Sequence, residues 1–268
     1  MKLAAIQMVS TPDVRTNLAA ARQLLSQAAD AGAELAVLPE YFCLLGAQDT
    51  DKLNIAEPLG GGPLQDFLAQ CATDFKLWIA GGTVPLASSQ LGKVYNSTLV
   101  YSPRGARVAR YDKIHLFCFD NGQESYDESR VLLPGSQPVT FELPSRDGHT
   151  WRVGLSICYD LRFAELYRAL QADLLLVPSA FTHTTGQAHW ELLLRARAIE
   201  NLAYVAAAAQ GGRHDNGRRT WGQSMVIGPW GDVLAEQAEG PGVVLADVDQ
   251  PTLAARRQQL PALDHRRL

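Results

Sequence analysis

The chain has 268 residues, of which 47% are hydrophobic and 19% are charged, and its formal net charge is −4. This composition can bury one large core, and the slightly acidic balance excludes a general attraction to nucleic acid or to an anionic membrane. With four cysteines and no signal-peptide or membrane-spanning pattern, the sequence predicts a cytoplasmic protein with reduced thiols and a single domain over residues 1–268.

Strand and helix patterns alternate along the chain in two similar series. The first series predicts a strand, a helix, a strand, a helix and two strands at 2–9, 14–31, 34–38, 64–75, 77–83 and 95–101. After an irregular stretch at 119–137, the second series predicts strands at 140–143, 151–157, 173–177, 204–209, 224–228 and 243–247, with helices after Cys158 and at 189–201. Apolar strands such as 174–177 need cover on both faces, so the sequence predicts layered sheets with helices outside.

The first candidate site residue is Glu40, which follows the apolar run 34–38 and Pro39. A carboxylate in this position is as readily a solvated loop residue as a site residue. The second candidate is Lys113, which lies between Tyr111 and the apolar pair that begins with Ile114. Taken alone, a lysine is more often an ordinary surface residue, so Lys113 gains weight only together with the other candidates.

The third candidate is Cys158, which lies where the alternating strand 151–157 meets a helical pattern over 163–170. We expect Asp160 to cap the first turn of that helix. A cysteine just before a helix lies near the positive end of the helix dipole, which would lower its pKa and favour the thiolate. Isolated cysteines are usually small buried hydrophobes, and this reading fits the three that lack such a setting: Cys43, Cys71 and Cys118.

Three segments together resemble the three motifs of the nitrilase superfamily of carbon-nitrogen hydrolases: Leu38-Pro39-Glu40, 111–116 and 154–163. The resemblance implies an α/β fold, a four-layer αββα sandwich, with a Glu-Lys-Cys triad at Glu40, Lys113 and Cys158. It also implies a second carboxylate at Glu128 that positions the substrate. Neither a cofactor nor a metal is expected, and the partner is a small-molecule amide, with no nucleic acid and no membrane.

The triad predicts amide hydrolysis through a thioester. Cys158 would attack the carbonyl while Glu40 accepts its proton, which is general acid-base catalysis. Lys113 and the backbone N–H of Tyr159 would stabilise the oxyanion. Water activated by Glu40 would then release the acid.

Three other readings of the sequence stay open beside this one. Metal catalysis has little support, because His183 and His189 match no zinc pattern. A Cys-His hydrolase that pairs Cys158 with one of these histidines leaves Glu40 and Lys113 unexplained. A catalytically inactive binding or scaffold member has no reason to keep these residues around a thiol.

Within the family, the chain resembles the Nit branch, and Arg213-His214 and 239–242 are more similar to the group that cleaves deaminated glutathione than to ω-amidases acting on α-ketoglutaramate. An N-carbamoyl compound or another small linear amide is a further alternative. The loop 117–125 departs from the favoured group. Candidate substrate-binding residues are Arg162, Ser179, Phe181, Arg213 and His214, with Arg218 as a further cation near the rim. The resemblance also implies a homodimer, which we expect to form through 163–170 and the tail 260–268.

Overall fold

The computed structural model describes residues 1–122 and 124–267, so Gln123 of the predicted irregular stretch and Leu268 of the predicted tail lie outside the description. Two large sheets form the centre of the molecule. The first has the strand order β17-β1-β2-β3-β4-β5, with β8 paired to β4. Its strands are β1 Lys2–Gln7, β2 Leu35–Val37, β3 Trp78–Ala87, β4 Val94–Tyr101, β5 Arg107–Asp112, β8 Leu132–Leu133 and β17 Gly242–Asp247.

The second sheet has the strand order β16-β15-β12-β11-β10-β9. Its strands are β9 Thr140–Pro144, β10 Thr150–Leu155, β11 Leu174–Leu176, β12 Tyr204–Ala207, β15 Ser224–Ile227 and β16 Val233–Gln237. Two small hairpins stand apart from the sheets: β6 Cys118–Asp120 with β7 Ser125–Asp127, and β13 Gly211–Arg213 with β14 Arg219–Trp221.

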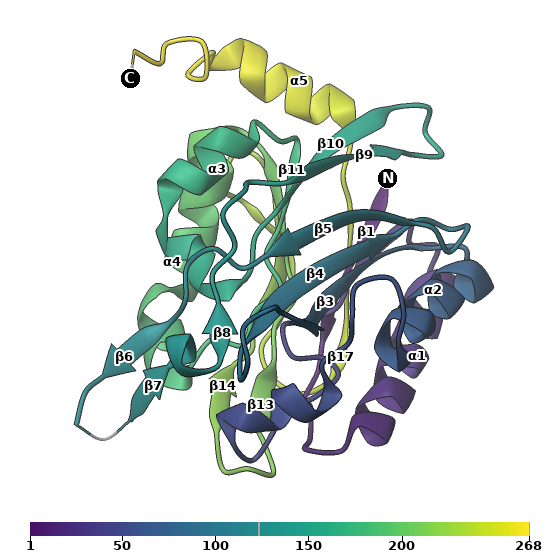
Figure 1. Cartoon of the computed structure of the whole chain (residues 1–268). Helices are drawn as coiled ribbons and strands as arrows, with labels where there is room; N and C mark the ends of the chain where they lie inside the picture. Colours follow the sequence, from purple (N-terminus) through teal and green to yellow (C-terminus); the bar gives the residue numbers. More distant parts are fainter. Residues whose placement is uncertain (123, 268) are drawn as a thin grey trace.

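Helices cover the outer face of each sheet (Figure 1). The helices are α1 Val14–Asp30 and α2 Pro63–Phe75 on the first sheet, α3 Ala164–Leu170 and α4 His183–Asn201 on the second, and α5 Gln250–Gln259 near the chain's end. Three short 3-10 helices are η1 Asp49–Ile55, η2 Glu128–Arg130 and η3 Cys158–Arg162. The predicted four-layer αββα sandwich is therefore confirmed.

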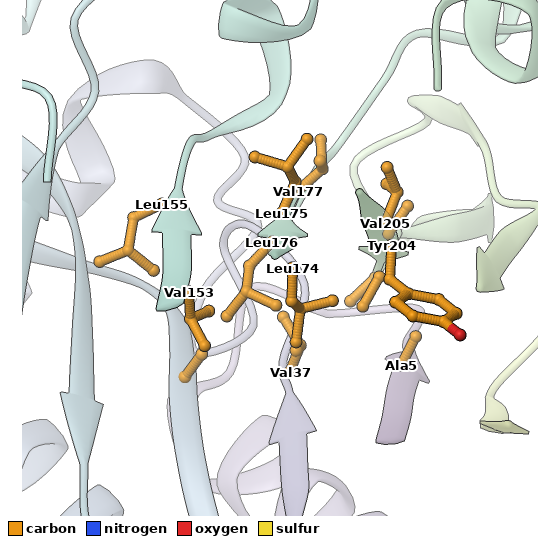
Figure 2. Close-up of a cluster of buried hydrophobic side chains, with 14 of the residues drawn as sticks. Ala5, Val37, Val153, Leu155, Leu174, Leu175, Leu176, Val177, Tyr204 and Val205 are labelled. Atoms are coloured by element: carbon orange, nitrogen blue, oxygen red, sulfur yellow. The ribbon is translucent and has the colours of Figure 1, made fainter. Parts of the chain in front are cut away.

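Alternation along the strands divides the core into layers. In β1, Leu3 and Ala5 belong to the core between the two sheets, whereas Ala4 and Ile6 belong to the core under the first pair of helices. Figure 2 shows Val37 of the first sheet opposite side chains of the second sheet in the shared core. Because side chains of successive strand residues point to opposite faces, one strand serves both layers.

The two sheets meet near the carboxyl ends of their central strands. Strands β1, β2 and β3 run parallel, as do β10, β11 and β12. Beyond them, the Met8 backbone N–H donates to the Ala209 carbonyl at 3.3 Å, and the Gly211 N–H donates to the Met8 carbonyl at 2.9 Å. Loops that follow parallel strands of both sheets are thus brought to one edge, where open α/β sheets bind ligands.

Some boundaries differ from the sequence prediction. Helix α4 begins at His183 and not at 189, because the Thr182 hydroxyl caps it by accepting from the Thr185 backbone N–H. Strand β5 was not predicted, since charged and partly exposed residues such as Arg107 and Arg110 hide its alternation. The stretch 119–137 is not wholly irregular, because it carries β7, η2 and β8.

Candidate active site

Cys158 occupies the turn between β10 and the second layer of helices. It is the first residue of η3 and has a left-handed backbone with φ 51°. A residue with a Cβ adopts this region only at some cost, which is typical of functional turns. The Cys158 backbone N–H donates to the Pro178 carbonyl at 2.9 Å, which holds the turn against the loop after β11. Its side chain is 8% exposed and lines a pocket.

The expected low pKa of Cys158 is wrong. Burial raises the pKa of this thiol well above its ordinary value, and the negative charge of Glu40 raises it further, although Lys113 acts in the opposite direction. The helix dipole is weak here because η3 is only five residues long and α3 begins at Ala164. The resting side chain is therefore a thiol that needs a base.

Asp160 does not cap α3 as predicted, but links the Cys158 turn to the Lys113 segment. Its fully buried carboxylate accepts from the Ile157 backbone N–H at 2.9 Å and from the Tyr111 hydroxyl at 2.7 Å. The other oxygen accepts from the His115 backbone N–H at 3.0 Å and contacts His115 Nδ1 at 2.7 Å. These contacts fix the thiol-bearing turn relative to the segment that carries Lys113, directly after β5.

Glu40 follows β2 and is 1% exposed. Its Oε1 accepts from Asn96 Nδ2 at 2.8 Å and lies 3.0 Å from Lys113 Nζ, while Oε2 accepts from the Ala180 backbone N–H at 2.9 Å. Glycine is required at position 82 on neighbouring β3, because a Cβ there would collide with the Pro39 carbonyl oxygen. The carboxylate is thus held by groups from both sheets.

Lys113 lies between two carboxylates at the base of the site. Its Nζ lies 3.0 Å from Glu40 Oε1 and 2.9 Å from Glu128 Oε1, and the side chain is 1% exposed. Although burial acts to lower the pKa of Lys113, the two carboxylates hold it well above its ordinary value. The ammonium is therefore permanent in the folded protein.

Glu128, the second predicted carboxylate, begins η2. Besides Lys113, it accepts from the Tyr41 hydroxyl at 2.9 Å and from the Phe117 backbone N–H at 2.7 Å. Burial acts to raise the pKa of Glu128, but the charge and hydrogen bond of Lys113, the Phe117 N–H and the charge of Lys52 bring it below its ordinary value. Tyr41 itself has φ 58°, so a second left-handed residue lies beside the first carboxylate.

Glu40, Tyr41, Glu128 and Cys158 line a pocket of about 740 Å³, a volume that includes its opening to solvent. Its wall is rich in aromatic rings and in charged side chains of both signs, because four carboxylates, Glu40, Asp49, Asp127 and Glu128, line it beside four cations. The aromatic lining residues are Tyr41, Phe117, Tyr126, Tyr159 and Phe181, and the cationic ones are Lys52, Arg162, Arg218 and Arg219. Within the described chain, the Tyr159 backbone N–H donates to no acceptor, so it is available to a ligand. The arrangement offers a nucleophile, a base and an anion-binding wall.

Among the predicted binding residues, Arg162 and Phe181 line the pocket, but Ser179, Arg213 and His214 do not. Ser179 is fully buried, and the chain turns so that Ala180 faces the site instead. His214 is 3% exposed and is held by the Ser10 carbonyl and the Thr220 hydroxyl, both at 2.8 Å. Arg213 is exposed on β13, on a hairpin that the sequence did not predict. For these three, the predicted place in the pocket is wrong.

Sequence reasoning missed several groups that hold the site: Tyr41, Lys52, Asn96, the Ala180 N–H and Arg219. Asn96 interrupts the apolar pattern of β4, and a polar residue inside a buried strand was the available signal. The two histidines considered as metal ligands lie apart from this chemistry. His183 packs edge-on against Trp221, and His189 Nδ1 lies 3.3 Å from Arg162 Nη1. In the described ranges, no group of three or more His, Cys, Asp or Glu side chains is arranged to hold a metal ion.

Comparisons with known proteins agree with this geometry. A family model described as carbon-nitrogen hydrolase matches residues 2–258. The chain is 42% identical to a deaminated glutathione amidase of Synechocystis over 98% of this chain and 97% of that protein, and 42% identical to the human protein of that name over 99% and 82%. Among solved structures, Nit3 of Saccharomyces cerevisiae, described as a member of branch 10 of the nitrilase superfamily, is 30% identical with a TM-score of 0.85, covering 97% of this chain and 94% of that one.

Proposed function

The chain belongs to the carbon-nitrogen hydrolase family, in the Nit branch of the nitrilase superfamily, and we propose that it hydrolyses deaminated glutathione to α-ketoglutarate and cysteinylglycine. Deaminated glutathione is glutathione whose γ-glutamyl amino group has become a keto group, so the reaction repairs a metabolite. The observation that carries the proposal is the buried Glu40–Lys113–Glu128 chain beside the Cys158 thiol, at a pocket whose lining includes four cationic side chains.

Acylation begins with a thiol and not with a preformed thiolate, because burial raises the pKa of Cys158. Glu40 is placed to take the proton as Sγ attacks the amide carbon, since its carboxylate is fixed by Asn96, Ala180 and Lys113. The same carboxyl then gives the proton to the departing amine of cysteinylglycine. General acid-base catalysis of this kind contributes about 10² to 10⁴ in rate.

The tetrahedral intermediate carries a negative oxygen that needs preorganised donors. An ammonium has three N–H donors, and Lys113 directs two of them to Glu40 and Glu128, which leaves the third for the oxyanion. The unused backbone N–H of Tyr159 supplies a second donor. One such donor contributes about 10² to 10³ in rate. Water activated by Glu40 then hydrolyses the Cys158 thioester.

The pocket suits a substrate with a carboxylate at each end. Its lining carries four cationic side chains and four carboxylates, Glu40, Asp49, Asp127 and Glu128, and the buried Lys113 ammonium lies against two of these carboxylates. An anionic substrate would be repelled from the nucleophile unless cations on the wall compensate, and guanidinium groups bind carboxylates well. The aromatic rings cover the apolar parts of the substrate.

Hydrolysis of α-ketoglutaramate is the second candidate function, because that molecule shares the whole acyl half of deaminated glutathione. The test is a substrate panel with purified protein, read by mass spectrometry, that contains both compounds, glutamine and an N-carbamoyl amine. We expect the highest kcat/KM for deaminated glutathione. A higher value for α-ketoglutaramate would assign the chain to ω-amidase activity, and no turnover of any compound would favour an inactive binding member.

We also propose a cytoplasmic location. All four cysteines are free thiols, and a catalytic thiol survives in a reducing compartment. No helix in the described part of the chain is long and apolar enough to cross a membrane.

A further inference from the structure

Lys52 lies on the pocket wall without an assigned role. It belongs to η1, the 3-10 helix that follows the Glu40 loop, and its Nζ lies 4.8 Å from the centroid of the Tyr41 ring. That ring cannot swing away, because the Tyr41 hydroxyl is bound to Glu128. Lys52 is therefore held on the side of the pocket that carries the two carboxylates.

The pocket cations differ in whether the protein already neutralises them. Arg218 is paired with Asp49 at 2.8 Å, and Arg219 is paired with Glu239 at 3.4 Å. Among the residues that the structure describes, neither Lys52 nor Arg162 forms an ion pair. Arg162 is placed over the Tyr159 and Phe181 rings and beside His189. Lys52 has only one aromatic face and is the less satisfied of the two cations.

Partial burial makes the lack of an ion-pair partner costly for Lys52. It lowers the pKa of Lys52, against the opposing effects of Glu128, Asp49 and Glu40, while Arg218 lowers the pKa further. A cation that has lost part of its contact with water needs an anion close by, and the carboxylates that face Lys52, namely Glu40, Asp49 and Glu128, are all engaged elsewhere. The missing anion can come from the ligand.

We propose that Lys52 binds the carboxylate of the α-keto acid at the acyl end of the substrate, and so selects acyl groups that end in a carboxylate. This inference rests on the proposed function and names the recognition element within it.

The two ends of deaminated glutathione differ in reach. The keto-acid carboxylate is separated from the scissile carbonyl by two methylenes and the keto carbon, whereas the glycine carboxylate lies two residues beyond the bond, about 7 Å away in an extended chain. Lys52 is half-buried beside Tyr41, the neighbour of the general base, and Arg219 is 46% exposed at the rim. The keto-acid carboxylate, at the shorter end of the substrate, therefore matches Lys52. The glycine carboxylate, at the longer end, matches the rim.

The test compares α-ketoglutaramate with levulinamide, which keeps the keto group and the amide but has a methyl group in place of the carboxylate. Lys52→Met removes the charge and keeps the length of the side chain. Lys76→Met is the matched control, because Lys76 is exposed at the end of α2 and away from the pocket. We expect Lys52→Met to lower kcat/KM for α-ketoglutaramate about ten- to hundredfold, mostly through KM, and to affect levulinamide much less.

An equal loss of kcat/KM on both amides would mean that Lys52 has a structural role. No loss on either amide would mean that Lys52 does not contact the carboxylate. Each of these results overturns the inference. The comparison is made within each variant, so partial unfolding lowers both rates together and is recognised. If Lys52→Met does not fold, Lys52→Gln takes its place.

The wild-type protein supplies an independent check. It must prefer α-ketoglutaramate to levulinamide, and equal rates on the two would also overturn the inference. Failure of the proposed function looks different: the wild type would reject deaminated glutathione while the effect of Lys52 on α-ketoglutaramate remained.

Discussion

The Tyr41 hydroxyl donates a 2.9 Å hydrogen bond to Glu128 Oε1, the same oxygen that accepts from Lys113. The residue after the general base thus helps to fix the second carboxylate. We predict that Tyr41→Phe lowers kcat about three- to tenfold, because Glu128 keeps Lys113 and Phe117 N–H but loses one donor. Tyr204→Phe, which removes a hydroxyl bonded to the Asp249 carbonyl, is the control for steady-state kinetics.

Removing the buried ammonium should make stability depend on pH in a defined direction. In Lys113→Met, Glu128 is left buried beside the charge of Glu40, so its pKa in the folded state rises above the unfolded value. A carboxyl group whose pKa is higher in the folded state than in the unfolded state adds to the free energy of unfolding at pH values below its unfolded pKa. That contribution is lost as pH rises through its folded pKa. We therefore expect urea unfolding to show a deficit of about 3 to 5 kcal/mol near pH 8 that shrinks near pH 5.

The wild type should behave in the opposite way, because the pKa of Glu128 lies below its ordinary value of 4.5 and its contribution is lost only as pH falls below that value. The double variant Lys113→Met with Glu128→Gln is the control, since it removes one of the two buried charges and should recover stability at pH 8. A deficit in Lys113→Met that did not vary with pH would contradict this account.

Alkylation by iodoacetamide should separate the four cysteines. Cys118 is exposed, and Cys158 lines the pocket beside the base Glu40, so both should react although the pKa of Cys158 is raised. Burial raises the pKa of Cys43 to about 12 and of Cys71 to about 11, and neither lines the pocket, so these two should not react. Glu40→Gln should slow labelling of Cys158 but not of Cys118, because only Cys158 depends on that base. Peptide mass spectrometry with and without α-ketoglutaramate measures this. Equal protection of both thiols would rule out a specific site.

Two arginines that face each other across the β13–β14 hairpin provide a matched pair. Arg213 and Arg219 are register partners, but only Arg219 lines the pocket. We predict that Arg219→Ala lowers kcat/KM for deaminated glutathione about three- to tenfold and has less effect on α-ketoglutaramate, which lacks the glycine carboxylate. Arg213→Ala should leave both rates unchanged. A larger effect of Arg213→Ala would restore the role that the sequence suggested for it.

Self-association stays a prediction, but we now expect other residues than those of 163–170 to form the contact between subunits. The apolar side chains of α3 are buried within the chain, so they are not available to a partner as the sequence suggested. On α4, Leu192 is 70% exposed and Ile199 is 47% exposed, seven residues apart on one helix face. We expect light scattering to show a dimer at micromolar concentration that Leu192→Glu weakens. Leu91→Glu, in an exposed turn, is the control.

The sequence could predict that Glu40, Lys113 and Cys158 meet because the three motifs that carry them resemble those of one family, although the strand before Lys113 has no apolar pattern of its own. The sequence could not predict which of Ser179 and Ala180 points into the site, because a shift of one residue along the chain exchanges their orientations. Arg213 was preferred to Arg219 because the glycines of β13 hide the hairpin. The sequence predicted a lowered pKa for Cys158, whereas the pKa is raised, because it depends on burial and on charges brought from distant segments.

The contact between Glu40 and the Ala180 N–H has a consequence for the order of folding. Glu40 follows a strand of the first sheet, and Ala180 follows a strand of the second, as does Cys158. Until the sheets dock, a newly made chain holds a base in one half and a thiol in the other. Partly folded chains are therefore catalytically silent, and the reactive centre is assembled only when the two sheets that carry its parts have docked.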